Sequence, residues 1–327
     1  MFVFNTQSHT HTDPYTFHAA LAEFNVKRIA VGTPSAHWED DLHSELQYRL
    51  LEGRFLEELR LSVAPMTADV VTDPDQFVAW FESLADWGPG QHHPLFDWLA
   101  EEASSDQLKW FLTQEAAGEA GFDDLVAYTQ VKLPVQPKLE CARNYWDEMG
   151  RGKPRAMHGP LLENMVKVLN LQPSIETTVW ESLALSNTMQ GLATSRRYTY
   201  HSLGALGVIE LTAPLRAEKV AAGMKRLNYP HSARAYFDLH AVLDVAHSQA
   251  WIREVIRPLV TENPASASCL AEGALMRLRC GQLCFERYSK ELGLEFKHTK
   301  PALSTNYFMN HNRVQTASFA SISSSAQ

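Results

Sequence analysis

A histidine, an aspartate and a second histidine recur at helical spacing in the segment His240-Ala-Val-Leu-Asp244-Val-Ala-His247. Positions i, i+4 and i+7 of an α-helix lie on one narrow stripe, so the three side chains would stand one above another. Imidazole suits iron, copper and zinc, and an added carboxylate shifts the preference toward iron or manganese. The surrounding segment lacks glycine and has its first proline at Pro258. The pattern therefore predicts half of a metal site on one helix.

The remaining ligands of such a site must come from other helices, and Glu210 is the first candidate. It is the charged residue in the otherwise apolar stretch Leu203–Leu211. A carboxylate inside an apolar helix is costly unless it is paired or bound to a metal. We favour Glu210 as a ligand over the alternative, which is a buried ion pair with Arg216 or Arg234.

A second candidate region runs from Glu140 to His158. Glu148 lies near the end of a predicted helix, and His158 opens the next helix after a glycine-rich turn. Asp147 and Glu148 are neighbours and face different directions, so we expect only one of them to point inward. Glu140 lies about two turns earlier and is an alternative ligand or a hydrogen-bond partner of one.

These residues form a set of three imidazoles and three carboxylates. The candidate ligands are Glu148, His158, Glu210, His240, Asp244 and His247. Two irons bridged by a carboxylate would use such a set, whereas a structural zinc site needs four ligands. We expect Glu210 to be the bridging carboxylate, because it lies on the helix nearest in sequence to the His/Asp helix.

Two further pairs of charged residues are candidates for substrate contact. Glu115 and Glu119 lie at i, i+4, and we leave open whether they contact ligands or substrate or instead form a solvated face. Arg143 and Arg151 have the geometry to bind a substrate carboxylate in a bidentate pair. For each of the two arginines we favour the alternative, an ion pair at the surface or within a helix.

The elements that must position these side chains are helices. From residue 75 onward, helical periodicity is interrupted by clusters of proline and glycine, and no strand pattern of any length occurs. We predict an all-α protein, in which metal sites form between facing helices. The predicted helices cover residues 75–87, 94–103, 105–118, 122–130, 137–149, 159–169, 176–193, 201–227, 233–261 and 266–292, with a kink or break at Pro214.

The N-terminal part of the chain gives weaker signals. Residues 38–59 have a helical pattern, and residues 63–74 are typical of a linker. Residues 1–30 contain three histidines that could bind metal, but we favour a mobile arm. Those histidines are His9, His11 and His18.

Composition excludes several classes of function. The chain has 327 residues, of which 45% are hydrophobic and 20% charged, as in ordinary globular proteins. The net charge of −9 argues against nucleic acid as a partner, since phosphate binding needs clustered Lys and Arg. No apolar run spans a bilayer and no secretion signal opens the chain, so we predict a cytoplasmic protein. Cys280 and Cys284 lie one turn apart without a zinc pattern and are predicted to be buried thiols.

The segment Arg-Asn-Tyr-Trp-Asp-Glu-Met-Gly-Arg-Gly, the following Met-His, the isolated Glu210 and the His-x-x-x-Asp-x-x-His pattern resemble the haem-oxygenase-like diiron oxidases and oxygenases. The similarity covers about residues 106–292. It matches the family's ligand order, and it implies an all-helical bundle of the haem-oxygenase type without haem. We accordingly divide the chain into an N-terminal helical extension at residues 1–90, a diiron domain at 91–300 and a frayed tail at 301–327.

The resemblance also implies an activity. Two Fe(II) ions would activate O₂, the co-substrate, to oxidise a small molecule such as an amino acid by N-oxygenation, desaturation or oxidative C–C cleavage, in biosynthesis. The alternatives are a cofactor-independent oxidase or hydrolase on a similar scaffold, and a non-catalytic helical binding protein. Residues 1–90 would serve as a lid or in a homodimer.

Overall fold

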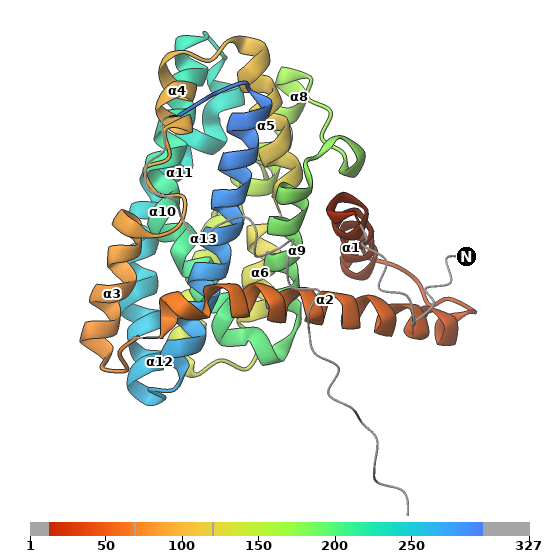
Figure 1. The fold of residues 1–327 in the computed structure, drawn as a ribbon, viewed down its shortest axis with the longest axis vertical. Helices are drawn as coiled ribbons and strands as arrows, with labels where there is room; N and C mark the ends of the chain where they lie inside the picture. Colours follow the sequence, from red (N-terminus) through yellow and green to blue (C-terminus); the bar gives the residue numbers. More distant parts are fainter. Residues whose placement is uncertain (1–12, 69, 120, 297–327) are drawn as a thin grey trace, which may run out of the picture. The chain divides into compact units, whose positions relative to one another are not determined.

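The computed structural model describes residues 13–68, 70–119 and 121–296, and within these ranges it is helical and free of strands. All of the helices belong to the compact unit that ends at Glu295 (Figure 1). The predicted all-α fold is therefore confirmed. The longer helices are α1 (Pro14–Ile29), α2 (Trp38–Thr67), α3 (Pro74–Trp87), α4 (Leu95–Glu101), α5 (Ser105–Gly118), α6 (Phe122–Thr129), α7 (Val135–Glu148), α8 (His158–Leu169), α9 (Trp180–Thr194), α10 (Thr199–Arg226), α11 (His231–Trp251), α12 (Arg257–Glu262) and α13 (Ser266–Glu291).

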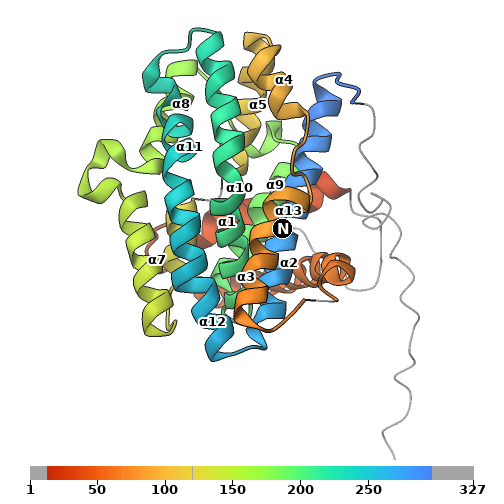
Figure 2. The ribbon, with the colours of Figure 1, turned by 90° about the vertical axis from the view of Figure 1, so that its left-hand side faces the viewer.

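Helix α10 lies at the centre of this unit and packs extensively against α11 and α13. In Figure 2 α10 and α11 run side by side. The contact with α13 depends on glycine: a Cβ added at Gly204 would lie 1.9 Å from the carbonyl oxygen of Leu270, and one at Gly273 would lie 1.9 Å from that of His201. The backbones approach so closely only because neither glycine has a side chain. This contact fixes the helix that carries Glu210.

Two of the long predicted helices differ from expectation in their continuity. α10 continues through Pro214 rather than breaking there, although proline leaves the carbonyl of Glu210 without its helical hydrogen bond. Packing against α11 and α13 along its length outweighs that local preference. The predicted helix at 233–261 is instead divided: a π-helix at Ile252–Ile256 separates α11 from α12, immediately before Pro258.

The mobile arm predicted for residues 1–30 is wrong over residues 14–29, which form α1. Asp13 caps this helix by accepting a hydrogen bond from the backbone N–H of Thr16. His18 is buried, its ring stacks on Trp180 at 5.6 Å, and burial lowers its pKa to about 3. His18 is thus a core residue, while His9 and His11 lie outside the described residues. The segment is helical because its apolar face is buried against α2 and α9.

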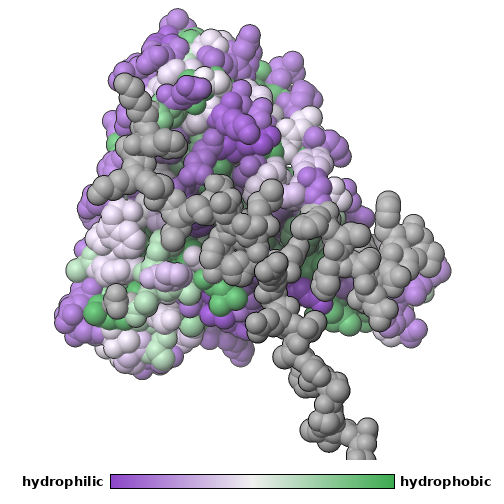
Figure 3. All heavy atoms as spheres, in the orientation of Figure 1, coloured by the Kyte–Doolittle hydropathy of each residue, from purple (hydrophilic) through white to green (hydrophobic). Residues whose placement is uncertain are grey.

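Helix α2 is longer than predicted and includes the first part of the expected linker. In Figure 1 it runs across α9 and α13, both of which it contacts. Its N-terminal half leaves Trp38, Leu42, Leu46 and Leu50 more than half exposed. Figure 3 shows hydrophobic patches at the level of α2, below a mainly hydrophilic upper half. The division at residue 90 stays a prediction, and the predicted tail lies outside the described residues.

The structure also bears on the two cysteines and on membrane-spanning helices. Cys280 and Cys284 are buried and unpaired, as predicted. Among the helices of the described part of the chain, none is long and apolar enough to cross a membrane.

Candidate metal centre

Five of the six predicted ligands converge in two groups that share one residue. Glu148, His158 and His240 offer ligand atoms within 4.8 Å of one another, and so do Glu148, Glu210 and His247. These residues come from four helices, α7, α8, α10 and α11, and the only shared residue of the two groups is Glu148. We expected Glu210 to be the carboxylate shared by two groups of ligands. In the structure Glu148 is the shared residue, and Glu210 belongs to one group.

The sixth predicted ligand, Asp244, lies on α11 between His240 and His247. It is buried, with 3% of its surface exposed, and belongs to neither of the two groups. It faces the cavity that adjoins them. All six residues therefore lie in one region, as the helical spacing of the sequence pattern requires.

A compact turn brings Glu148 and His158 together. After α7 the chain makes two short 3₁₀ turns, at Gly150–Gly152 and Pro154–Ala156. Gly150 has a φ of 60°, and a Cβ there would lie 2.5 Å from the carbonyl carbon of Ala156, so only glycine fits. The turn places Nδ1 of His158 2.6 Å from a carboxylate oxygen of Glu148.

That short contact tests whether the site suits a metal ion. Although Nδ1 of His158 and Oε2 of Glu148 are only 2.6 Å apart, they do not meet the angular requirements of a hydrogen bond. Nδ1 of His158 is buried and has no hydrogen-bond partner in the structure. A buried polar atom without a partner is costly. An imidazole nitrogen and a carboxylate oxygen that face the same point are the donors that iron binds, so the residues fit the ion.

The outer nitrogens of the two other histidines are held by hydrogen bonds. The Nδ1–H of His240 donates to the carbonyl oxygen of Tyr236 at 2.7 Å, which leaves Nε2 for the site. The Nε2 of His247 lies 3.2 Å from Asp147, and its Nδ1 lies 3.5 Å from Glu210. Such partners fix the tautomer and orientation of ligand histidines.

The three neighbouring carboxylates of α7 take different places. Glu148 points into the cluster, Asp147 contacts His247 from outside, and Glu140 forms an ion pair with Arg143 at 2.6 Å. Asp147 also pairs with Arg151 at 2.5 Å. Arg143 and Arg151 thus form the intrahelical or surface ion pairs that we favoured over substrate contact. The direction of each side chain follows from its position around the helix.

Asn144 is a site residue that the sequence analysis missed. Its side-chain Nδ2 donates to Glu210 at 2.6 Å and lies 3.3 Å from Nδ1 of His247, and its Oδ1 is buried without a partner. A signal was present: Asn144 lies four residues before Glu148 and therefore on the same face of α7. Asn144 orients Glu210 within the cluster.

The cluster carries carboxylates that burial strongly destabilises in their charged form. Burial, with the charge of Glu210, raises the pKa of Glu148 to about 9, and burial with Glu210 and Glu148 raises that of Asp244 to about 10. Burial lowers the pKa of both His158 and His240 to about 4. Two neutral imidazoles lie beside carboxylates that form no ion pair with a lysine or arginine in the described part of the chain, and such an environment suits bound cations.

The pKa of His247 is raised, whereas the pKa values of His158 and His240 are lowered. Burial alone would lower its pKa, but the hydrogen bond and charge of Glu210, together with Asp147, raise it to about 9. Without a metal, the imidazolium of His247 is thus the cation that compensates Glu210. A metal ion bound at Nδ1 would take over this compensation.

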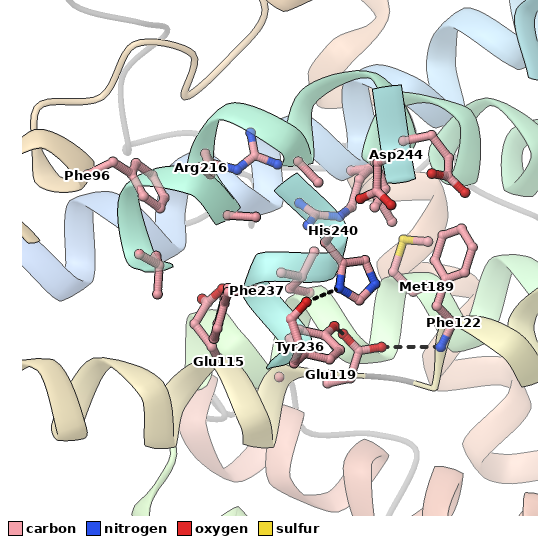
Figure 4. A pocket seen from close by; sticks show the side chains of 18 of the residues that line it. Phe96, Glu115, Glu119, Phe122, Met189, Arg216, Tyr236, Phe237, His240 and Asp244 are labelled. Atoms are coloured by element: carbon pink, nitrogen blue, oxygen red, sulfur yellow. Dashed lines mark hydrogen bonds between the residues drawn. The ribbon is translucent and has the colours of Figure 1, made fainter. Parts of the chain in front are cut away.

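A cavity adjoins the cluster and is lined by Glu148, Glu210, His240 and Asp244 on one side. It contains about 1130 Å³ of space not filled by atoms, its opening to solvent included. Figure 4 shows His240 in the middle of the view, Asp244 toward one end and Arg216 toward the other. Much of the remaining lining is apolar, namely Phe96, Phe122, Leu125, Leu185, Met189, Ile209, Val220, Phe237 and Phe285.

Glu115 and Glu119, whose role the sequence left open, both line this cavity. One carboxylate oxygen of Glu119 accepts hydrogen bonds from the backbone N–H groups of Gly121 and Phe122, and the other accepts from the hydroxyl of Tyr236 at 3.4 Å. Figure 4 shows Glu115 and Glu119 on the opposite side of the cavity from Arg216. Both carboxylates therefore line the same cavity as the candidate ligands.

Comparison with known proteins agrees with this architecture. A crystal structure of a CADD-like protein of unknown function from Nostoc punctiforme is similar to the chain with a TM-score of 0.50 and 17% identity. The match covers 69% of this chain and 99% of that protein, and it shows a shared fold, the expected haem-oxygenase-like bundle. No curated protein matches the sequence significantly.

A family model provides the sequence evidence. The model for iron-containing redox enzymes of the haem-oxygenase-like type matches residues 109–282, just over half of the 327-residue chain. The matched range includes all six predicted ligands and the helices that carry them. The chain belongs to this family of iron-containing redox enzymes.

Proposed function

We propose that the protein is a non-haem diiron oxidase or oxygenase that uses O₂ to oxidise a small, amino-acid-like substrate. The observation that carries this proposal is the pair of buried ligand groups that share Glu148 beside a cavity. A carboxylate shared by two ligand groups is what a dinuclear site requires, and a single-ion site would not need the second group. N-oxygenation, desaturation and C–C cleavage are all compatible with it.

The side chains divide into two sets of ligands. Glu148, His158 and His240 would hold one ion, and Glu148, Glu210 and His247 the other, with Asp244 adjoining both. When bound, the two Fe(II) ions would supply electrons for the reduction of O₂. Glu148, which belongs to both groups, would help to hold both ions.

The rest of the chain prepares and protects this site. Tyr236 and Asp147 hold the outer nitrogens of His240 and His247, so the inner nitrogens already face the cluster. The protons that burial keeps on Glu148 and Asp244 must leave when a metal binds. The apolar part of the cavity lining would limit the access of water to the reacting groups.

The proposal is tested by anaerobic loading with Fe(II), followed by measurement of bound iron and of O₂ consumption. We expect two irons per chain and a visible absorption change on mixing with O₂ that a substrate accelerates. One iron per chain, or none, would contradict a dinuclear site. Turnover by the chelator-treated protein would instead favour a cofactor-independent enzyme.

A further inference from the structure

Two arginines line the cavity at a distance from the candidate metal ligands and lack an acidic partner. Arg216 comes from α10 and Arg277 from α13. Within the described residues, neither guanidinium has a carboxylate within 4 Å. Arg216 donates to the hydroxyl of Thr212 at 3.1 Å and lies over the ring of Phe285, 5.6 Å from its centre. The cavity thus has a positive pole that forms no direct ion pair among the described residues.

The environment of Arg216 disfavours its charged form. Burial, together with the charge of Arg277, lowers the pKa of Arg216 to about 9. Cations deep in a protein are normally paired with an acid. Two that face the same cavity without a partner indicate a site for an anion, and planar guanidinium groups match the geometry of a carboxylate.

The opposite wall of the cavity holds a negative pole. Glu115 and Glu119, on and directly after α5, form no ion pair within 4 Å in the described part of the chain. Burial raises the pKa of both carboxyl groups. A hydrogen bond from Tyr288 lowers that of Glu115, backbone hydrogen bonds lower that of Glu119, and the charge of Arg277 lowers both. The acids and the arginines therefore influence one another across the cavity without touching.

Two cations and two acids that line one cavity without a direct ion pair match a ligand that carries one charge of each sign. We propose that Arg216 and Arg277 bind the carboxylate of an α-amino acid and that Glu115 accepts its ammonium group. The amino-acid side chain then extends along the apolar lining toward His240 and Asp244; Figure 4 shows Arg216 and Asp244 toward opposite ends of the view, with His240 between them. This inference rests on the proposed function only in treating the cavity as the substrate site.

A simple carboxylic acid would satisfy the arginines but not the acidic wall. A phosphate group would bring two negative charges close to Glu115 and Glu119. An amine without a carboxylate would leave both arginines unpaired. The zwitterion is the class that satisfies both poles at once.

The test uses metal-free protein, so that it does not depend on iron chemistry. Thermal shift with each of the twenty proteinogenic L-amino acids identifies the most stabilising one. Calorimetry then compares this amino acid with the matching amine that lacks the carboxylate and the matching acid that lacks the amine. We expect each analogue to bind at least about tenfold more weakly. No stabilisation by any amino acid, or equal binding of an analogue, would overturn the inference.

Variants locate the head group on the two walls. Arg277→Gln and Glu115→Gln should each weaken binding of the amino acid by at least about tenfold while iron uptake stays at the wild-type value. Arg253→Gln is the matched control, because it removes an exposed arginine whose partner is Glu254. Wild-type binding by both cavity variants would contradict the assignment.

Thermal stability separates binding from a structural role. Because Arg216 and Arg277 have no acidic partner to lose, Arg216→Gln and Arg277→Gln should melt at or above the wild-type temperature. A lower melting temperature with unchanged amino-acid affinity would assign the arginines to the fold instead. Amino-acid binding without iron uptake would preserve this inference and reject the diiron proposal, and the reverse result would do the opposite.

Discussion

The two ends of the cavity gather buried ionisable groups of opposite kind, acids at one end and arginines at the other. At one end, Glu148, Glu210 and Asp244 are buried together, and no lysine or arginine of the described chain forms an ion pair with them. At the other end, Arg216 and Arg277 have no carboxylate within 4 Å among the described residues. The first end requires cations and the second requires an anion.

A single helix, α10, contributes residues to both ends of the cavity. α10 carries Glu210 toward the candidate metal end and Arg216 toward the other end, less than two turns apart. Each end is rigid because its side chains come from packed helices. We therefore expect the metal ions and the substrate head group to bind independently, and the following predictions test that separation.

The largest effect is expected from His247→Ala. The variant removes a ligand and leaves Glu210 without its imidazole partner, so we expect it to lose iron and all measurable turnover. Iron content and O₂ consumption check this result. Amino-acid binding to the metal-free variant should persist. Wild-type iron and turnover in His247→Ala would refute the assignment of the cluster.

A smaller effect is expected from Asp147→Asn. Asp147 lies outside the cluster and contacts the outer nitrogen of His247, so its loss should reduce iron affinity by about 10- to 100-fold without abolishing it. Competition with an iron chelator measures this change. Glu140→Gln is the control, because Glu140 pairs with Arg143 and should leave iron affinity unchanged. A loss of iron in Glu140→Gln would show that Glu140, the alternative considered from sequence, is a ligand.

The ionisable residues of the metal end should also make the free energy of unfolding of the metal-free protein depend on pH. Between about pH 6.5 and 9, folded protein holds protons on Glu148, Asp244 and His247 that the unfolded chain has released. The free energy of unfolding therefore falls as pH rises through this window. The lowered pKa of His158 and His240 gives the opposite slope, but only between about pH 4 and 6.5.

Calorimetric melting temperatures of chelator-treated and anaerobically Fe(II)-loaded protein measure this dependence. Bound metal replaces the protons, so the slope contributed by the cluster should disappear in the loaded protein. Identical slopes in both forms would argue against metal binding at these residues.

The smallest effect concerns Pro214, which lies on α10 between the two ends. Pro214→Ala restores the backbone N–H that can donate to the carbonyl of Glu210, and we expect it to raise the free energy of unfolding by about 1 kcal/mol. Iron content should not change. Denaturant unfolding measures the effect, and a less stable variant would show that the proline is required for the packing of α10.

The spacing of residues along the chain was enough to predict much of the candidate site and most helix boundaries. The i, i+4, i+7 pattern of α11 placed His240, Asp244 and His247 in one region, because a helix repeats every 3.6 residues whatever surrounds it. The glycines and prolines between helices likewise marked most element boundaries. Local preference did not end the helix at Pro214, and it failed over α1, because packing against distant helices outweighed it.

The helical class, the family resemblance and the residue types of the candidate metal site could be predicted from the sequence, because they depend on short-range spacing and chemical identity. Only the tertiary structure decided that Glu148 faces the cluster while Glu140 pairs with Arg143, and that Asn144 contacts Glu210. Only the fold also brings Arg216 and Arg277 together without an acidic partner. The physical reason is that charge compensation depends on distances between helices far apart in the chain, which no local pattern encodes.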